Sequence, residues 1–187
     1  MSLLLDKFKI VHNTETTFNE LNTYCSNVDE LIFFRNIDEK WSIAENLIHL
    51  IKTTKITLLA LRVPKFILRL KYGKPNRPSL SYEELMSKYS EKLEAGNKSP
   101  EKFVPKNKDL NTTKDKIIES WKDIAEAYLN RLRYYWDDEI LDQYLVPHPL
   151  LGKLTMREMA YFTIYHTKHH FKAIRQRNRE AIEIPAA

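Results

Sequence analysis

Four segments of this 187-residue chain carry apolar residues at intervals of three or four positions, and this pattern constrains the fold most strongly. Residues spaced in this way lie on one face of an α-helix, and that face has to be buried against other elements. The segments cover residues 17–34, 42–62, 114–136 and 155–177. No pair of strand-like segments competes with them, and only three glycines are available for the tight turns of hairpin-rich folds. The sequence therefore predicts an all-α four-helix bundle.

Three capping boxes mark where helices should begin. In each box a Ser or Thr hydroxyl accepts a hydrogen bond from the backbone amide of a glutamate three residues on, and the glutamate side chain accepts from the amide of the Ser or Thr. The boxes occupy residues 42–45, 81–84 and 155–158, and the middle one opens a shorter helix that should end before Gly96. We therefore expect residues 1–187 to form a single domain. It should be an up-down bundle with one long crossover connection that contains a short extra helix.

The net charge of +5 raises the question of a nucleic-acid partner. The basic residues are spread along the chain, whereas nucleic-acid-binding proteins usually carry a denser basic stripe. One modest concentration consists of Lys65, Arg69, Lys71, Lys74 and Arg77. We expect it to be a solvated connection, and the alternative is that it borders a pocket and attracts an anionic substrate. A nucleic-acid partner is therefore not expected.

Location is indicated by what the sequence lacks. No segment has the charged-then-apolar layout of a signal peptide, and no apolar run approaches the roughly 20 residues needed to cross a membrane. Cys25 is the single cysteine, which rules out an intrachain disulfide and a cysteine-rich zinc site. It falls on the apolar face of the first helix, so we expect a buried and inert thiol. We expect a cytoplasmic protein without a membrane partner.

Three of the histidines lie close together in the last predicted helix. At about 100° per residue, His166 and His170 lie one turn apart on the face that should be buried, whereas His169 lies at the edge of the polar face. Histidine is the commonest metal ligand, and two histidines at this spacing can reach one ion. A hydrogen-bonded pair of core histidines is the other interpretation.

A metal site of this kind needs a further ligand from another element. His49 in the second helix is the first candidate, although the helical period places it well off the main apolar face, where it would be exposed or face a groove between helices. His148, in a turn between Pro147 and Pro149, is the second candidate. His12 lies in a polar N-terminal stretch, and nothing favours it. The residues alone leave this choice open.

Two stretches of the chain resemble the DinB/YfiT-like family of four-helix-bundle metalloproteins. Residues 41–50 are similar to that family's tryptophan-led helix ending in a histidine, and residues 148–170 are similar to its His-Pro…Gly…Leu-Thr loop followed by a paired histidine. In that family one histidine of the second helix and two of the last helix hold a divalent metal. The resemblance therefore implies His49, His166 and His170 as the ligands.

The implied ligand set limits which metal ions the site could hold. Ala173 stands where the family often has a glutamine, so no glutamine enters the expected chemistry, and His169 is expected at the rim of the site. Three imidazoles leave at least one coordination position for water or substrate, which is typical of a catalytic site. All-nitrogen ligation suits zinc or nickel, with iron and copper as alternatives. The expected cofactor is one divalent metal ion.

Two chemistries agree with such a site. A bound water whose pKa falls to about 7 is a nucleophile for hydrolysis, and a bound thiol is deprotonated outright. The resemblance implies both, because the family includes transferases and isomerases that use low-molecular-weight thiols, and proteins associated with metal-dependent hydrolysis. We expect a metal-dependent transferase or hydrolase acting on a small molecule, and a homodimer is compatible with the sequence. The alternative is a non-catalytic metal-binding or stress-related interaction protein of the same fold.

A general acid or base is harder to assign. Glu45 lies one turn before His49 and is one candidate, although its capping box already gives it a structural role. His148 is the other candidate, provided that its turn folds over the metal; otherwise it is a plain turn residue. Glu158 has the same structural role as Glu45, in the capping box that begins the last helix.

Overall fold

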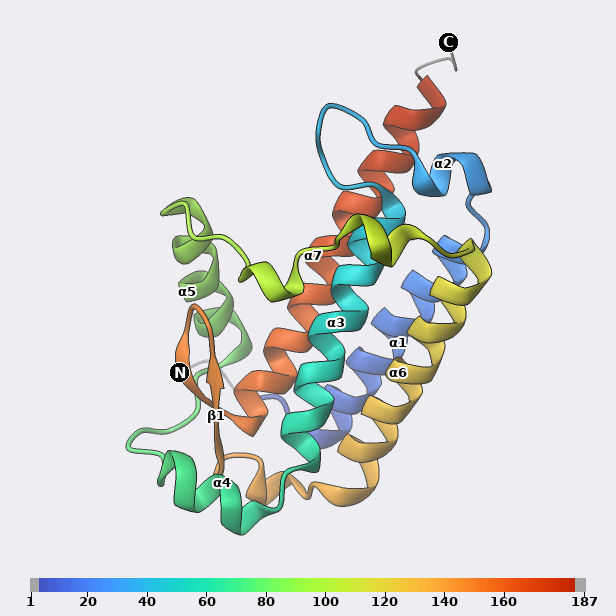
Figure 1. Cartoon of the computed structure of the whole chain (residues 1–187). Coiled ribbons are helices and arrows are strands. Elements are labelled where there is room, and N and C mark those ends of the chain that lie inside the picture. Colours follow the sequence, from blue (N-terminus) through green and yellow to red (C-terminus); the bar gives the residue numbers. More distant parts are fainter. Residues whose placement is uncertain (1–3, 184–187) are drawn as a thin grey trace.

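The structure, a computed structural model, describes residues 4–183 and confirms the all-α fold (Figure 1). Four long helices form the bundle: α1, Lys7–Ser26; α3, Ile43–Arg62; α6, Lys114–Tyr135; and α7, Met156–Glu183. The shorter elements are the helices α2, Glu30–Phe34; α4, Lys65–Tyr72; and α5, Tyr82–Glu94; the 3₁₀ turns η1, Glu101–Phe103; η2, Asn107–Leu110; and η3, Asp138–Ile140; and the strands β1, Leu145–His148, and β2, Gly152–Thr155. Within the described residues these two strands make up the only sheet, an antiparallel hairpin.

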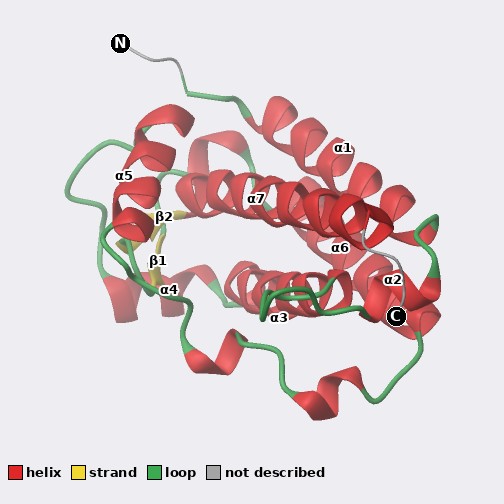
Figure 2. Ribbon diagram, turned by 90° about the horizontal axis from the view of Figure 1, so that it is seen from above, coloured by secondary structure: helices red, strands yellow, loops and turns green. Residues whose placement is uncertain are grey.

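Each long helix packs against two of the others. Helices α1 and α3 both contact α6 and α7, and α7 lies between α1 and α3 when the bundle is seen from above (Figure 2). Apolar side chains from all four helices meet in the core, where the ring of Phe18 in α1 packs edge-on against Trp121 in α6. Leu47 of α3 and Ile164 of α7 are buried in the same core. This packing fixes the positions of α3 and α7, on which the site described below depends.

The long connection between α3 and α6 determines how the helices run. The backbone oxygen of Leu61, near the end of α3, accepts hydrogen bonds from the side chains of Arg131 and Trp136 at the end of α6, so these two helices are parallel. Parallel neighbours cannot be joined by a tight turn, and residues 63–113 therefore return along the bundle (Figure 1). This connection contains α4, α5, η1 and η2, and η1 and η2 pack on α3. The expected crossover with a short extra helix is confirmed.

All three expected capping boxes form. Ser42 Oγ accepts from the amide of Glu45 at 3.2 Å, and the Glu45 carboxylate accepts from the amide of Ser42 at 2.7 Å. The box at residues 81–84 has the same two bonds. At the start of α7, Thr155 and Glu158 exchange the equivalent bonds at 3.2 and 2.8 Å. Each box satisfies backbone amides that have no partner inside the helix, and so sets where α3, α5 and α7 begin.

Some local predictions were wrong. The first main helix begins earlier than expected, at Lys7 with Asp6 as its N-cap, and residues 27–29 separate it from α2. The basic segment that was expected to be a plain connection begins with the helix α4, whose N-cap position is occupied by Pro64. The hairpin was not expected; its turn is completed by Gly152 at a φ of +73°, a value that favours glycine.

Candidate metal centre

Three histidines from two antiparallel helices meet at one point. His49 lies on α3, and His166 and His170 lie one turn apart on α7. One ring nitrogen of each lies within 4.8 Å of those of the other two. Helices α3 and α7 lie side by side both in Figure 1 and in Figure 2. The structure thus brings together the three residues that the family resemblance implies as ligands.

His49 is buried, with 2 % of its surface exposed, although the period of its helix places it off the apolar face. The crossover connection accounts for this difference, because it passes over this side of α3. The backbone oxygen of Phe103 in η1 accepts a hydrogen bond from Nδ1 of His49 at 3.0 Å. This bond assigns the ring proton to Nδ1 and leaves Nε2 with a free lone pair. Burial lowers the pKa of His49, which favours the neutral ring that a metal requires.

Asn46 orients His170 in the same way. Nδ1 of His170 donates to Oδ1 of Asn46 at 2.8 Å. The amide nitrogen of Asn46 donates to the backbone oxygens of Trp41 and Ser42, so that only its oxygen is left to face the histidine. Nε2 of His170 is therefore free to bind a metal. Burial lowers the pKa of His170 well below its ordinary value, and the ring is neutral.

His166 completes the cluster. Its Nε2 lies 3.1 Å from Nε2 of His49. Two imidazole nitrogens bound to one tetrahedral zinc ion would lie about 3.3 Å apart, so this pair is already close to the required spacing. Burial, and then the neighbouring His170, lower the pKa of His166 well below its ordinary value. Neutral imidazoles with converging nitrogens fit a divalent ion such as zinc or nickel.

The histidines form part of the wall of a cavity of about 500 Å³. The wall comes from α3, α5, η1, the hairpin turn and α7, and it is mostly apolar. Among the described residues that line it, none is an Asp or a Glu, and Lys98 is the only Lys or Arg. An open coordination position would therefore face a mostly apolar space whose described lining contains no carboxylate. Prominent apolar lining residues are Trp41, Ile56, Leu93, Leu150, Met159 and Phe162.

His148 lines the same cavity from the end of β1, where its ring centroid lies 4.2 Å from that of Phe162. Its Nδ1 accepts hydrogen bonds from the backbone amides of Leu150 and Leu151 at 3.2 and 3.1 Å. These two bonds place the ring proton on Nε2. Burial lowers the pKa of His148 to about 4. His148 is therefore a neutral hydrogen-bond donor held in a tight turn beside the cavity.

The other candidates from the sequence lie elsewhere. The Glu45 carboxylate accepts from the Ser42 amide and from Nδ2 of Asn36, both at 2.7 Å, and Glu45 does not line the cavity. The structure thus does not bring Glu45 to the three histidines. His169 is exposed and lines the cavity, which places it at the rim. His12, in the stretch characterised above only as polar, lies on α1 and is exposed.

Two partners of the site were missed in the sequence. Asn46 precedes His49 by three residues, so helical spacing alone was a usable signal that it lies on the same face. Phe103 acts through its backbone oxygen, and no residue type could have identified that contact.

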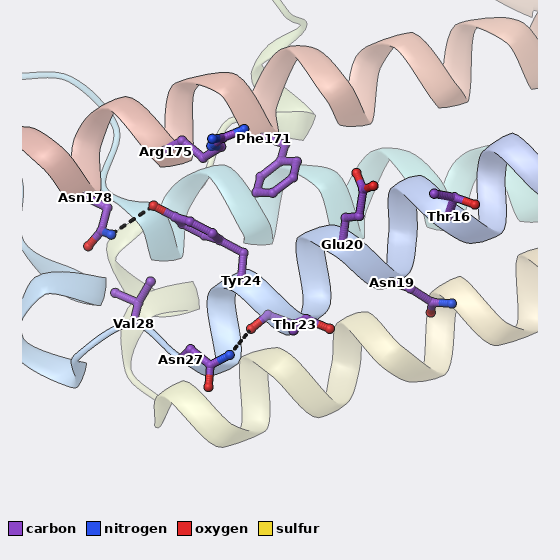
Figure 3. Close-up of a pocket in the computed structure, with 10 residues that line it drawn as sticks. All are labelled: Thr16, Asn19, Glu20, Thr23, Tyr24, Asn27, Val28, Phe171, Arg175 and Asn178. Carbon is purple, nitrogen blue, oxygen red and sulfur yellow. Dashed lines mark hydrogen bonds between the residues drawn. The ribbon is translucent and has the colours of Figure 1, made fainter.

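A second depression lies between α1 and α7 and contains no histidine (Figure 3). Tyr24 and Phe171 lie edge to face at 5.4 Å in its wall, and Nδ2 of Asn178 donates to the hydroxyl of Tyr24 at 2.9 Å. Nδ2 of Asn27 donates to the backbone oxygen of Thr23 at 2.9 Å. The group of side chains found among the described residues that could hold a metal lies in the histidine-lined cavity and not in this depression.

The fold and the site together define a class of protein: a four-helix bundle whose second and last long helices present three neutral histidines to one cavity. The sequence profile of the DinB superfamily matches residues 13–174, a range that includes all three histidines. The chain belongs to the DinB superfamily. A comparison with curated protein sequences found no significant match.

Among solved structures, the fold is similar to that of YfiT from Bacillus subtilis, with a TM-score of 0.63 over 93 % of this chain and 86 % of that chain. That protein is described as a probable metal-dependent hydrolase with an unusual four-helix bundle topology. The two sequences are 14 % identical, so the likeness shows a shared fold. The family resemblance and the fold predicted from the sequence are confirmed.

Proposed function

We propose that the protein is a metal-dependent enzyme in which His49, His166 and His170 hold one divalent ion. Zinc and nickel suit this all-nitrogen site best, with iron and copper as alternatives. The observation that carries the proposal is the orientation of the rings: Nδ1 of His49 and Nδ1 of His170 both donate to fixed oxygen acceptors, and the Nε2 atoms converge. Acceptors of this kind are a regular feature of metal-binding histidines. When bound, the ion would supply a Lewis acid that lowers the pKa of a water or thiol to near neutrality.

The surroundings of the three histidines favour catalysis over a structural role. Structural zinc sites are closed by four protein ligands, whereas the group found among the described residues has three members and opens on a cavity. A volume of about 500 Å³ accommodates a small molecule. The apolar wall favours a substrate with an apolar part and limits the access of water. All three ligands belong to one chain, so the site does not depend on a homodimer.

We assign His148 the role of a hydrogen-bond donor to the substrate. Its Nε2 carries the ring proton because Nδ1 accepts from Leu150 and Leu151. A neutral donor fixed by the backbone can stabilise negative charge that develops on a substrate oxygen. Action as a base at Nδ1 would require the loss of both bonds in the turn. Glu45 would likewise have to leave its capping box to act.

Hydrolysis of a small ester or amide is the first candidate reaction. A Lewis acid and a fixed neutral donor are the two groups that an acyl-transfer reaction needs for its developing oxyanion. The similarity to YfiT, described as a probable metal-dependent hydrolase, supports this choice.

Thiol-dependent transfer is the second candidate, and the observation in its favour is the absence of Asp and Glu from the described lining of the cavity. A thiol that binds a metal loses its proton without the help of a carboxylate base. Cys25 cannot supply this thiol, because it is buried and burial raises its pKa to about 12. A low-molecular-weight thiol from solution would be required.

A direct test is a screen of the metal-loaded protein against small chromogenic esters and amides, and against electrophilic aryl halides with and without added thiol. His166→Ala should abolish any activity, whereas Lys168→Ala, an exposed position on the same helix, should retain it. Activity that survives His166→Ala would contradict the proposal. A protein that binds metal but shows neither activity would favour the non-catalytic metal-binding or stress-related alternative.

A further inference from the structure

Helix α4 of the crossover connection presents apolar residues to solvent. Leu68 is its one buried residue, and Phe66 and Leu70, which lie one turn apart on the opposite side, are 72 % and 86 % exposed. Ile67 beside them is exposed as well. Helix α4 forms the outer edge of one end of the bundle (Figure 1), and no residue of α4 lines the two cavities described above. These side chains therefore form an apolar surface patch that no other described part of the chain covers.

Exposed basic side chains lie next to this apolar patch in the chain. No Asp or Glu occurs in the sequence between Glu45 and Glu83, whereas the basic segment begins within α4 and continues beyond it. Of that segment's five basic residues, Arg77 is the only one for which the described residues include an ion pair. Lys71 and Lys74 are exposed. Lys71 and Lys74 therefore carry exposed positive charge that no ion pair among the described residues neutralises.

Aromatic residues extend the same end of the molecule. Tyr134 and Tyr135, the last residues of α6, are both exposed. Lys65 of α4 lies 5.2 Å above the ring of Trp136, so the start of α4 is next to the end of α6. Tyrosine combines an apolar ring with a polar hydroxyl and is favoured at the boundary between lipid and water.

We propose that the α4 face, defined as Phe66, Ile67 and Leu70 together with Lys71 and Lys74, binds the surface of an anionic lipid membrane. An amphipathic helix of this kind lies in the plane of the bilayer, with its aromatic and aliphatic side chains below the headgroups. Its basic side chains then meet the anionic headgroups. This proposal replaces the expectation, made from the sequence, of a protein without a membrane partner. That expectation rested on the lack of a membrane-spanning segment; among the described residues no helix has the length and hydropathy to cross a membrane, and attachment to the surface requires none.

The combination of charged and apolar side chains favours a membrane over the other possible partners of this face. If a second copy of the chain docked by the same face about a two-fold axis, Lys71 and Lys74 of one copy would lie close to the same lysines of the other. The like charges would repel each other. A nucleic acid would neutralise the lysines but would leave Phe66 and Leu70 without apolar contact. An anionic bilayer satisfies both sets of side chains.

Co-sedimentation with lipid vesicles tests the proposal. Vesicles of phosphatidylcholine alone are compared with vesicles of phosphatidylcholine and phosphatidylglycerol at roughly two to one. The wild-type protein should sediment with the anionic vesicles and remain in solution with the neutral ones. Phe66→Ser/Leu70→Ser and Lys71→Glu/Lys74→Glu should each weaken binding about tenfold or more. Added salt should weaken wild-type binding, because it screens the charges.

Matched controls come from the other end of the bundle. Leu31→Ser on α2 removes a leucine that is 84 % exposed, and Lys116→Glu/Lys122→Glu in the first half of α6 makes the same change in charge at exposed positions. Both should bind like the wild type. All variants should retain the metal content of the wild type, so this result is independent of the proposed function.

Two results would overturn the proposal: no binding to anionic vesicles at low salt, or equal binding by Phe66→Ser/Leu70→Ser. A wild-type dimer that becomes a monomer in that variant, without lipid binding, would assign the face to a second copy instead.

Discussion

Oδ1 of Asn46 lies 2.8 Å from Nδ1 of His170, and this hydrogen bond joins the first turns of α3 to the middle of α7. The Asn46 amide cannot turn over without loss, because its nitrogen donates to the backbone oxygens of Trp41 and Ser42. Ser42 is also the first residue of the capping box that begins α3. The start of one helix therefore fixes the orientation of a candidate ligand on another.

Replacing Asn46 should weaken metal binding without removing a ligand. In Asn46→Leu the acceptor for His170 is lost, the ring is free to turn, and we expect metal affinity to fall about 10- to 100-fold. Asn46→Asp retains the acceptor for His170 but loses the two bonds that Nδ2 donates to Trp41 and Ser42, so it should keep more metal affinity than Asn46→Leu while lowering the free energy of unfolding. Competition with a chromophoric chelator measures the affinity, and Asn19→Leu, at an exposed position of α1, is the control. An unchanged affinity in Asn46→Leu would show that the hydrogen bond does not hold a ligand.

His148 should make the stability of the metal-free protein depend on pH. Burial lowers its pKa from 6.5 to about 4. As pH falls below about 6.5, the unfolded chain takes up a proton that the folded chain accepts only near pH 4, so stability present above about pH 6.5 is lost as pH falls through about 4. At about 1.4 kcal/mol per pKa unit, this loss is at most about 3 kcal/mol.

His148→Gln is the variant that isolates this effect, because glutamine keeps a hydrogen-bond acceptor and does not titrate. Its free energy of unfolding should fall less than that of the wild type between about pH 7 and about pH 4. Urea unfolding in the presence of a chelator provides the measurement. The same pH dependence in both proteins would contradict the lowered pKa.

Cys25 should be unreactive in the native protein. Its side chain is buried, and burial raises the pKa of the thiol to about 12, so almost no thiolate is present near neutral pH. A chromogenic disulfide reagent should therefore label Cys25 slowly at about pH 8 and completely once urea unfolds the chain. Rapid labelling of the folded protein would show that this thiol is available for chemistry, and would reopen its assignment.

Glu158 should contribute far more to stability than its sequence motif indicates. Its side chain is fully buried and accepts from Arg77 at 2.5 Å, from the Leu80 amide at 2.8 Å and from the Thr155 amide at 2.8 Å. Glu158→Ala leaves these donors without their partner and should lower the free energy of unfolding by about 3 kcal/mol. Glu84→Ala removes the glutamate of the equivalent capping box, where the side chain is exposed, and should cost much less. If urea unfolding showed equal losses of unfolding free energy for the two variants, the larger contribution assigned to the buried Glu158 would be contradicted.

The bundle could be predicted because the signals for its helices lie within short stretches of the sequence. A buried helical face repeats along the sequence, and a capping box lies within four residues, so α3, α6 and the start of α7 were placed close to their observed bounds. The end of α7 was placed six residues too early, at about residue 177 rather than at Glu183. Helix α4 was missed because its apolar residues point outward, around the single buried Leu68. The hairpin was missed because each strand has only four residues. Segments this short carry too little periodicity to identify.

The site could be predicted only in part, because its geometry depends on contacts between distant segments. The spacing of His166 and His170 is local and indicated a shared target. The burial of His49 depends on Phe103, which lies 54 residues further along the chain. The spacing of apolar residues within α3 cannot indicate that contact. The family resemblance supplied His49, and the structure supplied the reason for its burial.

The measurement that tests the central claim most directly is the metal content of the purified protein, determined by elemental analysis for the wild type and four histidine variants. We expect about one equivalent of divalent metal in the wild type and in His169→Ala, and none in His49→Ala, His166→Ala or His170→Ala. Circular dichroism should show that all four variants remain helical. A wild-type protein that holds no metal, and takes up none from added zinc or nickel, would contradict the account.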